Sequence, residues 1–324
     1  MEQTPWDPED VAVGLDREGG LSPEAEALLP ALEPRALYKR LVAARLLDHR
    51  LGRLGLPMWA PAAGEEAVSV AVALLLGEGE WVYPGMRDLA IAPILGMDLD
   101  ELARQVLGLA ASDGERRAPA LYNGRAGALS ATDLGVAHVP EALGVHLGMA
   151  AGQAHANKLD GHEHACVALF GEGLTTAGLF HETVAAAVSA DLPLVMICKS
   201  QLWPEGAPAE AGLLGDSVAE RVKACGMWTR RADGADVFGV YQALAQAFAR
   251  AREGRGPALV EVVVTPLYNP DVPAHRDPVE RLRRYLDRAG HWTPAVEEAL
   301  EKELLGQLDR AFDYARDGDK VGNG

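Results

Sequence analysis

The stretch from residue 165 to residue 198 constrains the fold more than any other part of the sequence. Residues 165–170 and 194–198 are apolar runs of the length of a buried strand. Residues 174–190 between them have a helical composition, and a turn that contains Pro193 ends this helix. A strand, a helix and a second strand in immediate succession form a βαβ unit, in which the two strands are parallel. We therefore predict an α/β fold with a doubly wound, mainly parallel sheet.

The rest of the chain divides into a central domain with two appendages. Residues 1–30 are rich in Pro, Glu and Gly and are expected to form a flexible N-terminal arm. Residues 31–290 are predicted to form the α/β domain, and residues 291–324 a C-terminal helix and tail. Residues 111–142 are expected to form a long polar loop, which in a compact domain is usually functional or disordered. Apolar spacing predicts helices at 37–54, 64–76, 99–109, 143–158, 237–252 and 293–315, and strands at 80–83 and 258–264.

The composition excludes several classes of partner. The chain has 324 residues, is 48% hydrophobic and carries a formal net charge of −17. It can bury a sizeable core, but it has no apolar run long enough for a membrane span. Its negative charge repels nucleic acid and anionic membrane surfaces, so neither is an expected partner. Three cysteines without paired spacing and an N-terminus without a secretory signal favour the cytoplasm.

The turn Gly171-Glu172-Gly173 is the first candidate for chemistry, because ligands bind at the carboxyl ends of strands in an open parallel sheet. It follows the first strand of the βαβ unit and opens a helix, whose free N–H groups suit a phosphate. Lys199 and Gln201 follow the second strand. If the strands are neighbours, Glu172 and Gln201 offer hard oxygen ligands for Mg²⁺ held against a diphosphate. The alternative is a plain tight turn without a function.

Better-known motifs do not match. Thr176 stands where a dinucleotide-binding fingerprint needs a glycine, and Ala185 stands where a zinc-protease helix that begins at His181 needs its second histidine. The segment His162-Glu163-His164 offers metal-type ligands, but it lies between a predicted helix and a predicted strand. A solvated turn is therefore the favoured interpretation of that segment.

With these features, the chain resembles the alpha subunits of thiamine-diphosphate-dependent 2-oxoacid dehydrogenases of the pyruvate and branched-chain type. In that family two asparagines follow the glycine-acid-glycine turn at the end of the next strand, where this chain has Ser200 and Gln201. The resemblance covers residues 35 to 285. Its other segments are the first long helix at 37–53, a G-Q-E-A segment at 64–67, a Y-R-E segment at 83–88, a G-x-Q-x-P-x-A-x-G helix at 143–158 and a D-D-P loop at 277–278.

The resemblance implies a thiamine-diphosphate-binding fold and a set of metal ligands. Glu172 would bind Mg²⁺ through its carboxylate. Gln201 keeps the amide oxygen of the second asparagine but places it one methylene further out, and Mg²⁺ demands near-ideal octahedral geometry. Trp203 would stand where the family offers a backbone carbonyl to the metal, although an aromatic residue packed on the subunit surface is the equally good alternative.

The resemblance also implies contacts to the organic part of the cofactor. Arg87 would pair with the diphosphate, for which a bidentate guanidinium is suited, although it can also be an ordinary surface arginine. Lys199 would replace the family's basic diphosphate contact, and Gly171 and Gly173 would line the same site. The backbone of Leu143 would touch the aminopyrimidine ring.

Several positions depart from the family pattern. The histidine of the long polar loop is Leu121, the second active-site histidine is Val272, and the regulatory serines are absent. His275, three residues after Val272, and His146, in place of a glutamine, are weak candidates for a catalytic role. The alternatives are a loop histidine and a packed helix histidine, so no catalytic residue is assigned. Loss of positioned acid–base groups costs about 10²–10⁴-fold in rate.

The function implied by the resemblance is oxidative decarboxylation of a 2-oxoacid within a 2-oxoacid dehydrogenase complex. The partners would be a beta-type subunit, which supplies the activating glutamate, and a lipoyl-bearing acyltransferase, with two alpha and two beta chains in the assembly. The altered site keeps a second reading open, a noncatalytic relative that acts as a scaffold or regulatory subunit. A third is another α/β enzyme class, such as a nucleotide-dependent oxidoreductase.

Overall fold

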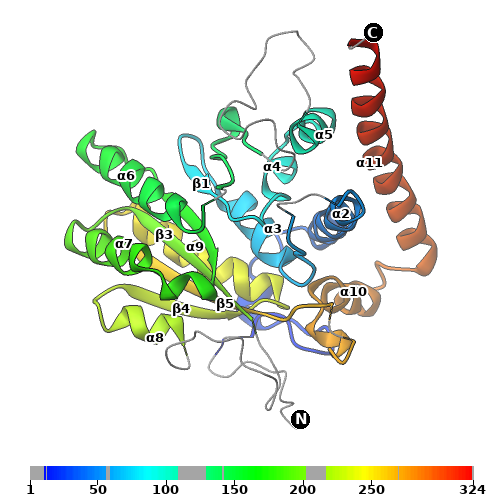
Figure 1. The fold of residues 1–324 in the computed structure, drawn as a ribbon. Coiled ribbons are helices and arrows are strands. Elements are labelled where there is room, and N and C mark those ends of the chain that lie inside the picture. The colour runs from blue at the N-terminus through cyan, green and yellow to red at the C-terminus, as the bar shows by residue number, and fades with distance from the viewer. Residues whose placement is uncertain are drawn as a thin grey trace.

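A five-stranded parallel sheet forms the centre of the computed structural model, which describes residues 11, 13–55, 59–108, 129–140, 142–201, 217–268 and 270–322. The strands are β1 (Trp81–Tyr83), β2 (Cys166–Gly171), β3 (Leu194–Gln201), β4 (Trp228–Asp233) and β5 (Ala258–Val264). Their order is β1-β2-β3-β5-β4, and every neighbouring pair is parallel (Figure 1). The predicted doubly wound α/β fold is confirmed.

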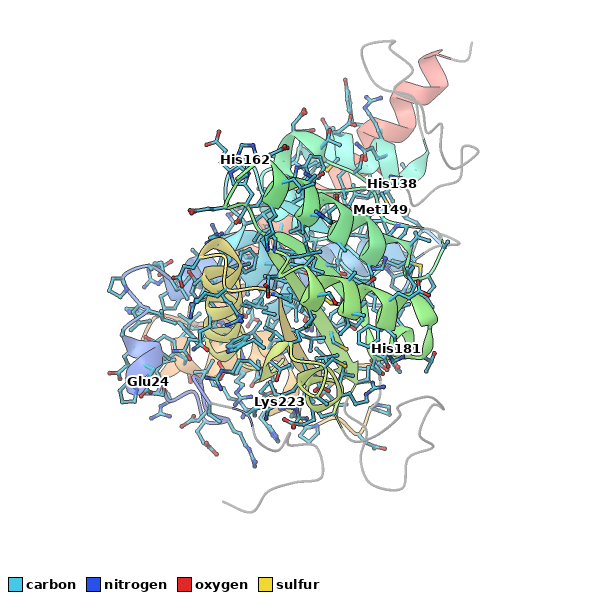
Figure 2. All side chains as sticks on the ribbon, turned by 90° about the vertical axis from the view of Figure 1, so that its left-hand side faces the viewer. Glu24, His138, Met149, His162, His181 and Lys223 are labelled. Atoms are coloured by element: carbon cyan, nitrogen blue, oxygen red, sulfur yellow. The ribbon has the colours of Figure 1, made fainter. Side chains whose placement is uncertain are left out.

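Helices cover both faces of this sheet because its strands are apolar on both sides. Alternate strand residues such as Val167 and Ile197 pack into the larger of two cores, with α3 (Glu66–Leu75) and α9 (Val237–Arg252). The other set, such as Cys166 and Met196, packs against α6 (Val145–Leu159), α7 (Gly178–Ser189) and α8 (Val218–Lys223). Figure 2 shows the molecule from the side of α6 and α7.

The remaining helices build an outer layer beyond α3. They are α1 (Pro23–Glu26), α2 (Pro34–Gly52), α4 (Ile91–Ile94), α5 (Leu99–Leu107), α10 (Pro278–Arg288) and α11 (Pro294–Gly322). The described residues also include three short 3-10 helices: η1 (Thr132–Leu134), η2 (Glu172–Thr176) and η3 (Ala274–Arg276). The long helix α11 packs on α2 and α5 through buried Leu308 and Phe312, and Figure 1 shows it at the side of the molecule farthest from α6 and α7.

The predicted helices and strands are found within a few residues of their expected bounds, except that α11 continues to Gly322 instead of ending at Ala315. The apolar pattern did not indicate the short helices α1, α4 and α8, the edge strand β4, or the helix α10, which is capped by the Asp277 carboxylate and begins at Pro278. Most of the predicted polar loop lies outside the described residues. Its described part includes η1 and a bridge between Val82 and Val136.

Residues 13–30 pack on the domain instead of extending from it as an arm. Leu15 and Ala25 are completely buried. The Asp236 carboxylate, at the start of α9, accepts hydrogen bonds from the backbone N–H groups of Gly14 and Leu15 at 2.6 and 2.9 Å. Residues 13–30 are therefore held by a buried anion and two apolar anchors, whereas the predicted domain boundaries themselves stay a prediction.

Two predictions from composition concern the whole molecule. No helix among the described residues is long and apolar enough to cross a membrane. The three cysteines are free: Cys166 and Cys198 are buried, and Cys225 is exposed.

Candidate functional site

The carboxyl ends of β2 and β3 lie side by side, as the sequence predicts. Gly171 is in register with Lys199, so Glu172 follows one strand where Ser200 and Gln201 end the other. The predicted helix after the glycine turn does not begin at once. The 3-10 helix η2 comes first, and α7 starts only at Gly178, because Ala177 is extended between them.

Lys199 is the central charge of this edge. Its side chain is 4% exposed, and its ammonium group lies 2.7 Å from a carboxylate oxygen of Glu65 and 2.7 Å from one of Asp88. Burial alone lowers the pKa of Lys199, but the two carboxylates outweigh it and hold the pKa above its ordinary value. The predicted diphosphate contact is thus a lysine whose charge already has two internal partners.

Glu65 reaches Lys199 because the chain makes a tight approach just before α3. Gly64 has a φ of +102°, and a Cβ atom there would lie 2.2 Å from the Thr265 carbonyl oxygen, so only glycine fits. Complete burial raises the pKa of the Glu65 carboxyl, against the lowering effect of Lys199 and Arg87. The Glu65 carboxylate shares the Lys199 ammonium group with Asp88.

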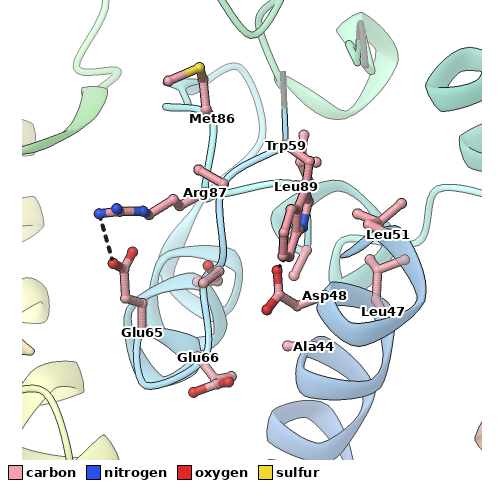
Figure 3. A pocket seen from close by; sticks show the side chains of 14 residues that line it. Ala44, Leu47, Asp48, Leu51, Trp59, Glu65, Glu66, Met86, Arg87 and Leu89 are labelled. Carbon is pink, nitrogen blue, oxygen red and sulfur yellow. Dashed lines mark hydrogen bonds and ion pairs between the residues drawn. The ribbon is translucent and has the colours of Figure 1, made fainter. Parts of the chain in front are cut away.

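Arg87 completes the group and gives it access to solvent. Its guanidinium lies 3.4 Å from the other oxygen of Glu65, and its side chain is 31% exposed (Figure 3). Asp88 is fixed in its turn because it also accepts a hydrogen bond from the Gly85 N–H at 2.9 Å. We call Glu65, Arg87, Asp88 and Lys199 the strand-end cluster. It holds two positive and two negative groups, and sequence reasoning assigned a role to its cations only.

Ser200 and Gln201 point to opposite faces of the sheet, because side chains alternate along a strand. The Ser200 hydroxyl donates to the buried Glu261 carboxylate at 2.8 Å, a group that also accepts hydrogen bonds from the Ser217 hydroxyl and the Ala219 N–H. Ser200 is therefore a structural contact toward α8. Gln201 shares the face of Lys199, which is the face of the strand-end cluster.

The predicted metal ligands are only partly described. Glu172 and Gln201 lie at the same edge of the sheet, whereas Trp203 lies outside the described residues, as does Leu121. Among the described residues, no group of three or more His, Cys, Asp or Glu side chains is arranged to hold a metal ion. The proposed set would instead combine one carboxylate with an amide and a backbone oxygen, and it stays a prediction.

The start of α6 borders the site. Gly144 has a φ of +90°, and a Cβ atom there would lie 2.7 Å from the side chain of Leu174, so the chain just before α6 passes close to η2. The His146 Nε2 donates to the Leu169 carbonyl oxygen at 2.9 Å, and burial lowers the pKa of this histidine. Its Nδ1 has no hydrogen-bond partner among the described residues. His146 is thus a packed, neutral histidine with one unused lone pair.

The second weak candidate lies elsewhere. His275 is in η3, beside Arg276, which is anchored to the end of β4 by an ion pair with Asp233. Val272, which stands where the family has a histidine, lines a cavity of 730 Å³ between α2 and the segment before α10. On the wall of this cavity Arg45 pairs with Asp277 and, from its other side, with Glu66.

The chemical types of the described residues at this edge suit a diphosphate. Arg87 and Lys199 bring two cations to the carboxyl edge, and the glycine turn leaves room for an anion beside the backbone. A Cβ atom at Gly171 would have its nearest neighbour, the Lys199 carbonyl oxygen, at 4.0 Å, and one at Gly173 would meet nothing within 4 Å. Glu172 and Gln201 add hard oxygen atoms at the same edge.

Comparison with known proteins decides the family. The model of a family described as the dehydrogenase E1 component matches residues 37–268, well over half of the chain. The chain belongs to this family. A 3-methyl-2-oxobutanoate dehydrogenase subunit alpha from Mycobacterium tuberculosis is 30% identical over 309 residues, covering 88% of this chain and 80% of the relative. A pyruvate dehydrogenase E1 component subunit alpha from Bacillus cereus is 28% identical over 313 residues, covering 89% and 80%.

More distant members support the same assignment. The 2-oxoisovalerate dehydrogenase subunit alpha 1 of Arabidopsis thaliana, a mitochondrial protein, is 25% identical over 330 residues, covering 94% of this chain and 68% of the relative. The predicted relationship to alpha subunits of 2-oxoacid dehydrogenases is confirmed, and with it the predicted class of oxidoreductase. The family depends on thiamine diphosphate. The matches support a subunit of an E1 enzyme and give no support to a noncatalytic scaffold or to a nucleotide-dependent oxidoreductase.

Proposed function

We propose that this chain is the alpha-type subunit that binds Mg²⁺ and the diphosphate of thiamine diphosphate for the oxidative decarboxylation of a 2-oxoacid. The observation that carries the proposal is the meeting of Arg87 and Lys199 at the sheet edge that also bears Glu172 and Gln201. When bound, the cofactor supplies the electron sink for loss of CO₂, and the protein supplies orientation and electrostatics.

Each residue of the edge has a proposed task. Arg87, the partly exposed cation, donates to the diphosphate oxygens in the bidentate manner of a guanidinium. Lys199 adds a buried point charge behind it. Glu172 and Gln201 offer a carboxylate and an amide oxygen to Mg²⁺, and the backbone carbonyl of Trp203 is the proposed third protein ligand.

The turn and the start of α6 hold the ligand by shape. Gly171 and Gly173 let a phosphate approach the backbone, and the backbone of Leu143 contacts the aminopyrimidine ring. His146 and His275 are not given a catalytic role here, because His146 is buried and neutral and His275 lies on η3. A beta-type partner is expected to supply the acid–base group that activates the cofactor.

The face formed by α6 supports the proposed partnership with a beta-type subunit. Met149 on α6 is 55% exposed (Figure 2), and Leu143, just before the helix, is 70% exposed; such exposure is unusual for large apolar side chains. Gly152 on the same helix leaves space for close packing of another helix, whereas Gly148 faces Leu179 of α7. The proposed assembly has two alpha and two beta chains in the cytoplasm and delivers its product to a lipoyl-bearing acyltransferase. The free state of all three cysteines supports the proposed compartment.

Calorimetry with Mg²⁺ and thiamine diphosphate, with and without a co-expressed beta-type chain, tests the proposal. We expect binding with the partner present, and Glu172→Ala should abolish the Mg²⁺-dependent part. Glu182→Ala, which removes an exposed carboxylate from α7, is the matched control and should bind like the wild type. Absence of binding in both preparations contradicts the proposal, and unchanged affinity in Glu172→Ala contradicts the metal assignment.

A further inference from the structure

We infer that Glu65 is the residue that sets the affinity of this site for its anionic ligand, because it occupies both cations that the ligand needs. The inference rests on the proposed function and deepens it. Glu65 stands where the resembling family has the neutral glutamine of its G-Q-E-A segment. One oxygen of its carboxylate lies 2.7 Å from the Lys199 ammonium, and the other lies 3.4 Å from the Arg87 guanidinium.

The charges of the strand-end cluster balance without any ligand. The side chains of Lys199, Glu65 and Asp88 are at most 6% exposed, so water screens their interactions poorly. Two cations face two carboxylates, and the cluster has no net positive charge to offer an incoming diphosphate. A site with a neutral residue at position 65 and the same neighbours would have a net charge of +1.

Glu65, and not Asp88, is the carboxylate that competes with a ligand. The second oxygen of Asp88 accepts the Gly85 N–H, and only its first oxygen meets Lys199, so Asp88 is a fixed part of its own turn. Glu65 instead bridges Lys199 to Arg87, and Arg87 is the member whose side chain reaches solvent. A phosphate that approaches Arg87 therefore meets the Glu65 carboxylate on the same guanidinium.

Removal of this one charge should strengthen binding. In Glu65→Gln, Lys199 keeps Asp88 as a partner, so the ammonium group is not left unpaired and the protein should fold. With the carboxylate gone, both cations act on the ligand alone. At charge separations of a few ångströms this predicts an affinity gain on the order of tenfold to a hundredfold.

The matched control is Glu66→Gln. Glu66 is the next residue, it is equally buried, and its substitution changes the net charge by the same amount. Its carboxylate, however, pairs with Arg45 and accepts the Gly64 N–H, on the side of α2. We expect the dissociation constant of this variant to match that of the wild type, and thermal unfolding of all three proteins shows whether each is folded.

The experiment measures the dissociation constants of thiamine diphosphate and of inorganic diphosphate, each with Mg²⁺, by calorimetry on the complex with the beta-type subunit. The expected result is tighter binding of both probes to Glu65→Gln and no change in Glu66→Gln. If wild type and Glu65→Gln bind equally well, the inference is wrong and the proposed function stands. If neither protein binds either probe, both are overturned.

A pH series separates neutralisation of Glu65 from a general effect of the substitution. The groups that face Glu65 are Lys199 of β3 and Arg87 and Asp88 before α4; His146 of α6 adds a more distant, neutral neighbour. As the pH falls toward the raised pKa of Glu65, the wild-type carboxyl becomes neutral and the two proteins become alike. The ratio of their dissociation constants, which cancels the titration of the ligand itself, should therefore approach one in acid. A ratio that does not change with pH overturns the inference.

Discussion

Two buried ion clusters lie at the carboxyl edge of the sheet. They differ in their access to solvent, and this difference distinguishes a cluster that stabilises the fold from one that can bind a ligand. The strand-end cluster joins Lys199 to Glu65 and Asp88, with Arg87 at the surface. The second, here called the loop cluster, consists of Asp233, Arg276 and Arg281. Asp233, the last residue of β4, lies 2.6 Å from each of the two guanidinium groups, and none of the three side chains is more than 6% exposed.

The pKa values of the two acids differ in direction. Burial raises the pKa of Glu65 in spite of its cations, whereas at Asp233 burial is outweighed by Arg276 and Arg281, which hold its pKa below the ordinary range. The Asp233 carboxylate lies between two enclosed guanidinium groups, so no ligand from solvent can replace it as their partner. A carboxylate that shares its lysine with a second acid, and whose other cation reaches solvent, can give way to a ligand. The strand-end cluster, in which Arg87 reaches solvent, is therefore the one suited to bind a ligand. The loop cluster, whose charges are all enclosed, is suited to hold the structure together.

The largest effect that we predict is loss of stability when the loop cluster loses its anion. Asp233→Ala leaves Arg276 and Arg281 buried without a carboxylate, and removal of one partner from a buried ion pair costs about 3–5 kcal/mol. These arginines tie η3 and α10 to the end of β4, so the whole transition should move. Chemical unfolding followed by circular dichroism measures the difference. A loss of unfolding free energy below about 1 kcal/mol, the value of an exposed ion pair, would show that the loop cluster does not stabilise the fold as proposed.

The same comparison predicts opposite responses to acid. The depressed pKa of Asp233 means that its stabilisation is complete above its unfolded pKa, near 3.8, and is lost as the pH falls through the lower folded value. The raised pKa of Glu65 means that its charged form costs stability, and this cost disappears as the pH falls toward 4.5. In acid, wild type should therefore lose its advantage over Asp233→Asn and gain stability relative to Glu65→Gln.

Unfolding free energies of the three proteins between neutral and acid pH test this prediction. The difference between wild type and Asp233→Asn should stay constant until the pH is below the ordinary aspartate range. A difference that already narrows near neutrality would contradict the direction of the Asp233 pKa.

Arg87 should matter to binding more than to stability. Its side chain is 31% exposed and its carboxylate partner keeps Lys199, so Arg87→Ala should lower the unfolding free energy by less than about 1 kcal/mol. Loss of charge-assisted hydrogen bonds to a phosphate should weaken thiamine diphosphate binding about tenfold to a hundredfold. Calorimetry measures this, and Arg255→Ala on the surface is the control. Equal losses of stability in Arg87→Ala and Asp233→Ala would remove the distinction between the clusters.

The sheet was predictable where its strands are buried on both faces. Residues 166–171 carry no charged side chain and residues 258–264 carry only Glu261, and such runs favour a buried strand in an α/β chain. The edge strand β4 was missed because it contains Arg230 and Arg231, and only its last two residues are buried. At an edge, one side of a strand meets solvent or a neighbouring helix, so its sequence carries no continuous apolar signal.

The location of the site could be predicted from the sequence, but the carboxylates that balance its cations could not. Parallel topology alone puts Glu172 beside the end of β3, and the family pattern pointed to Arg87 and Lys199. The anions that pair with these cations come from distant segments; Asp88 is 111 residues from Lys199 in the sequence. No local pattern tells which carboxylate a buried lysine will meet, because tertiary packing brings them together. A carboxylate at position 65, where the family has glutamine, was the one available signal.

The smallest loss of stability is expected when an exposed ion pair of similar length is broken. This substitution tests whether the burial of the charges, and not the distance between them, accounts for the stability that the clusters provide. Glu280 on α10 lies 2.5 Å from Arg283 and 3.0 Å from Arg284, but these side chains are 22–33% exposed. Water solvates all three groups when the pair is broken, so Glu280→Gln should cost less than about 1 kcal/mol in chemical unfolding. Glu280 stands next to Arg281 on α10, so this substitution perturbs the helix that the loop cluster ties to Asp233 of β4. A cost equal to that of Asp233→Ala would mean that helix α10, and not enclosure of the charges, carries the stability assigned to the loop cluster.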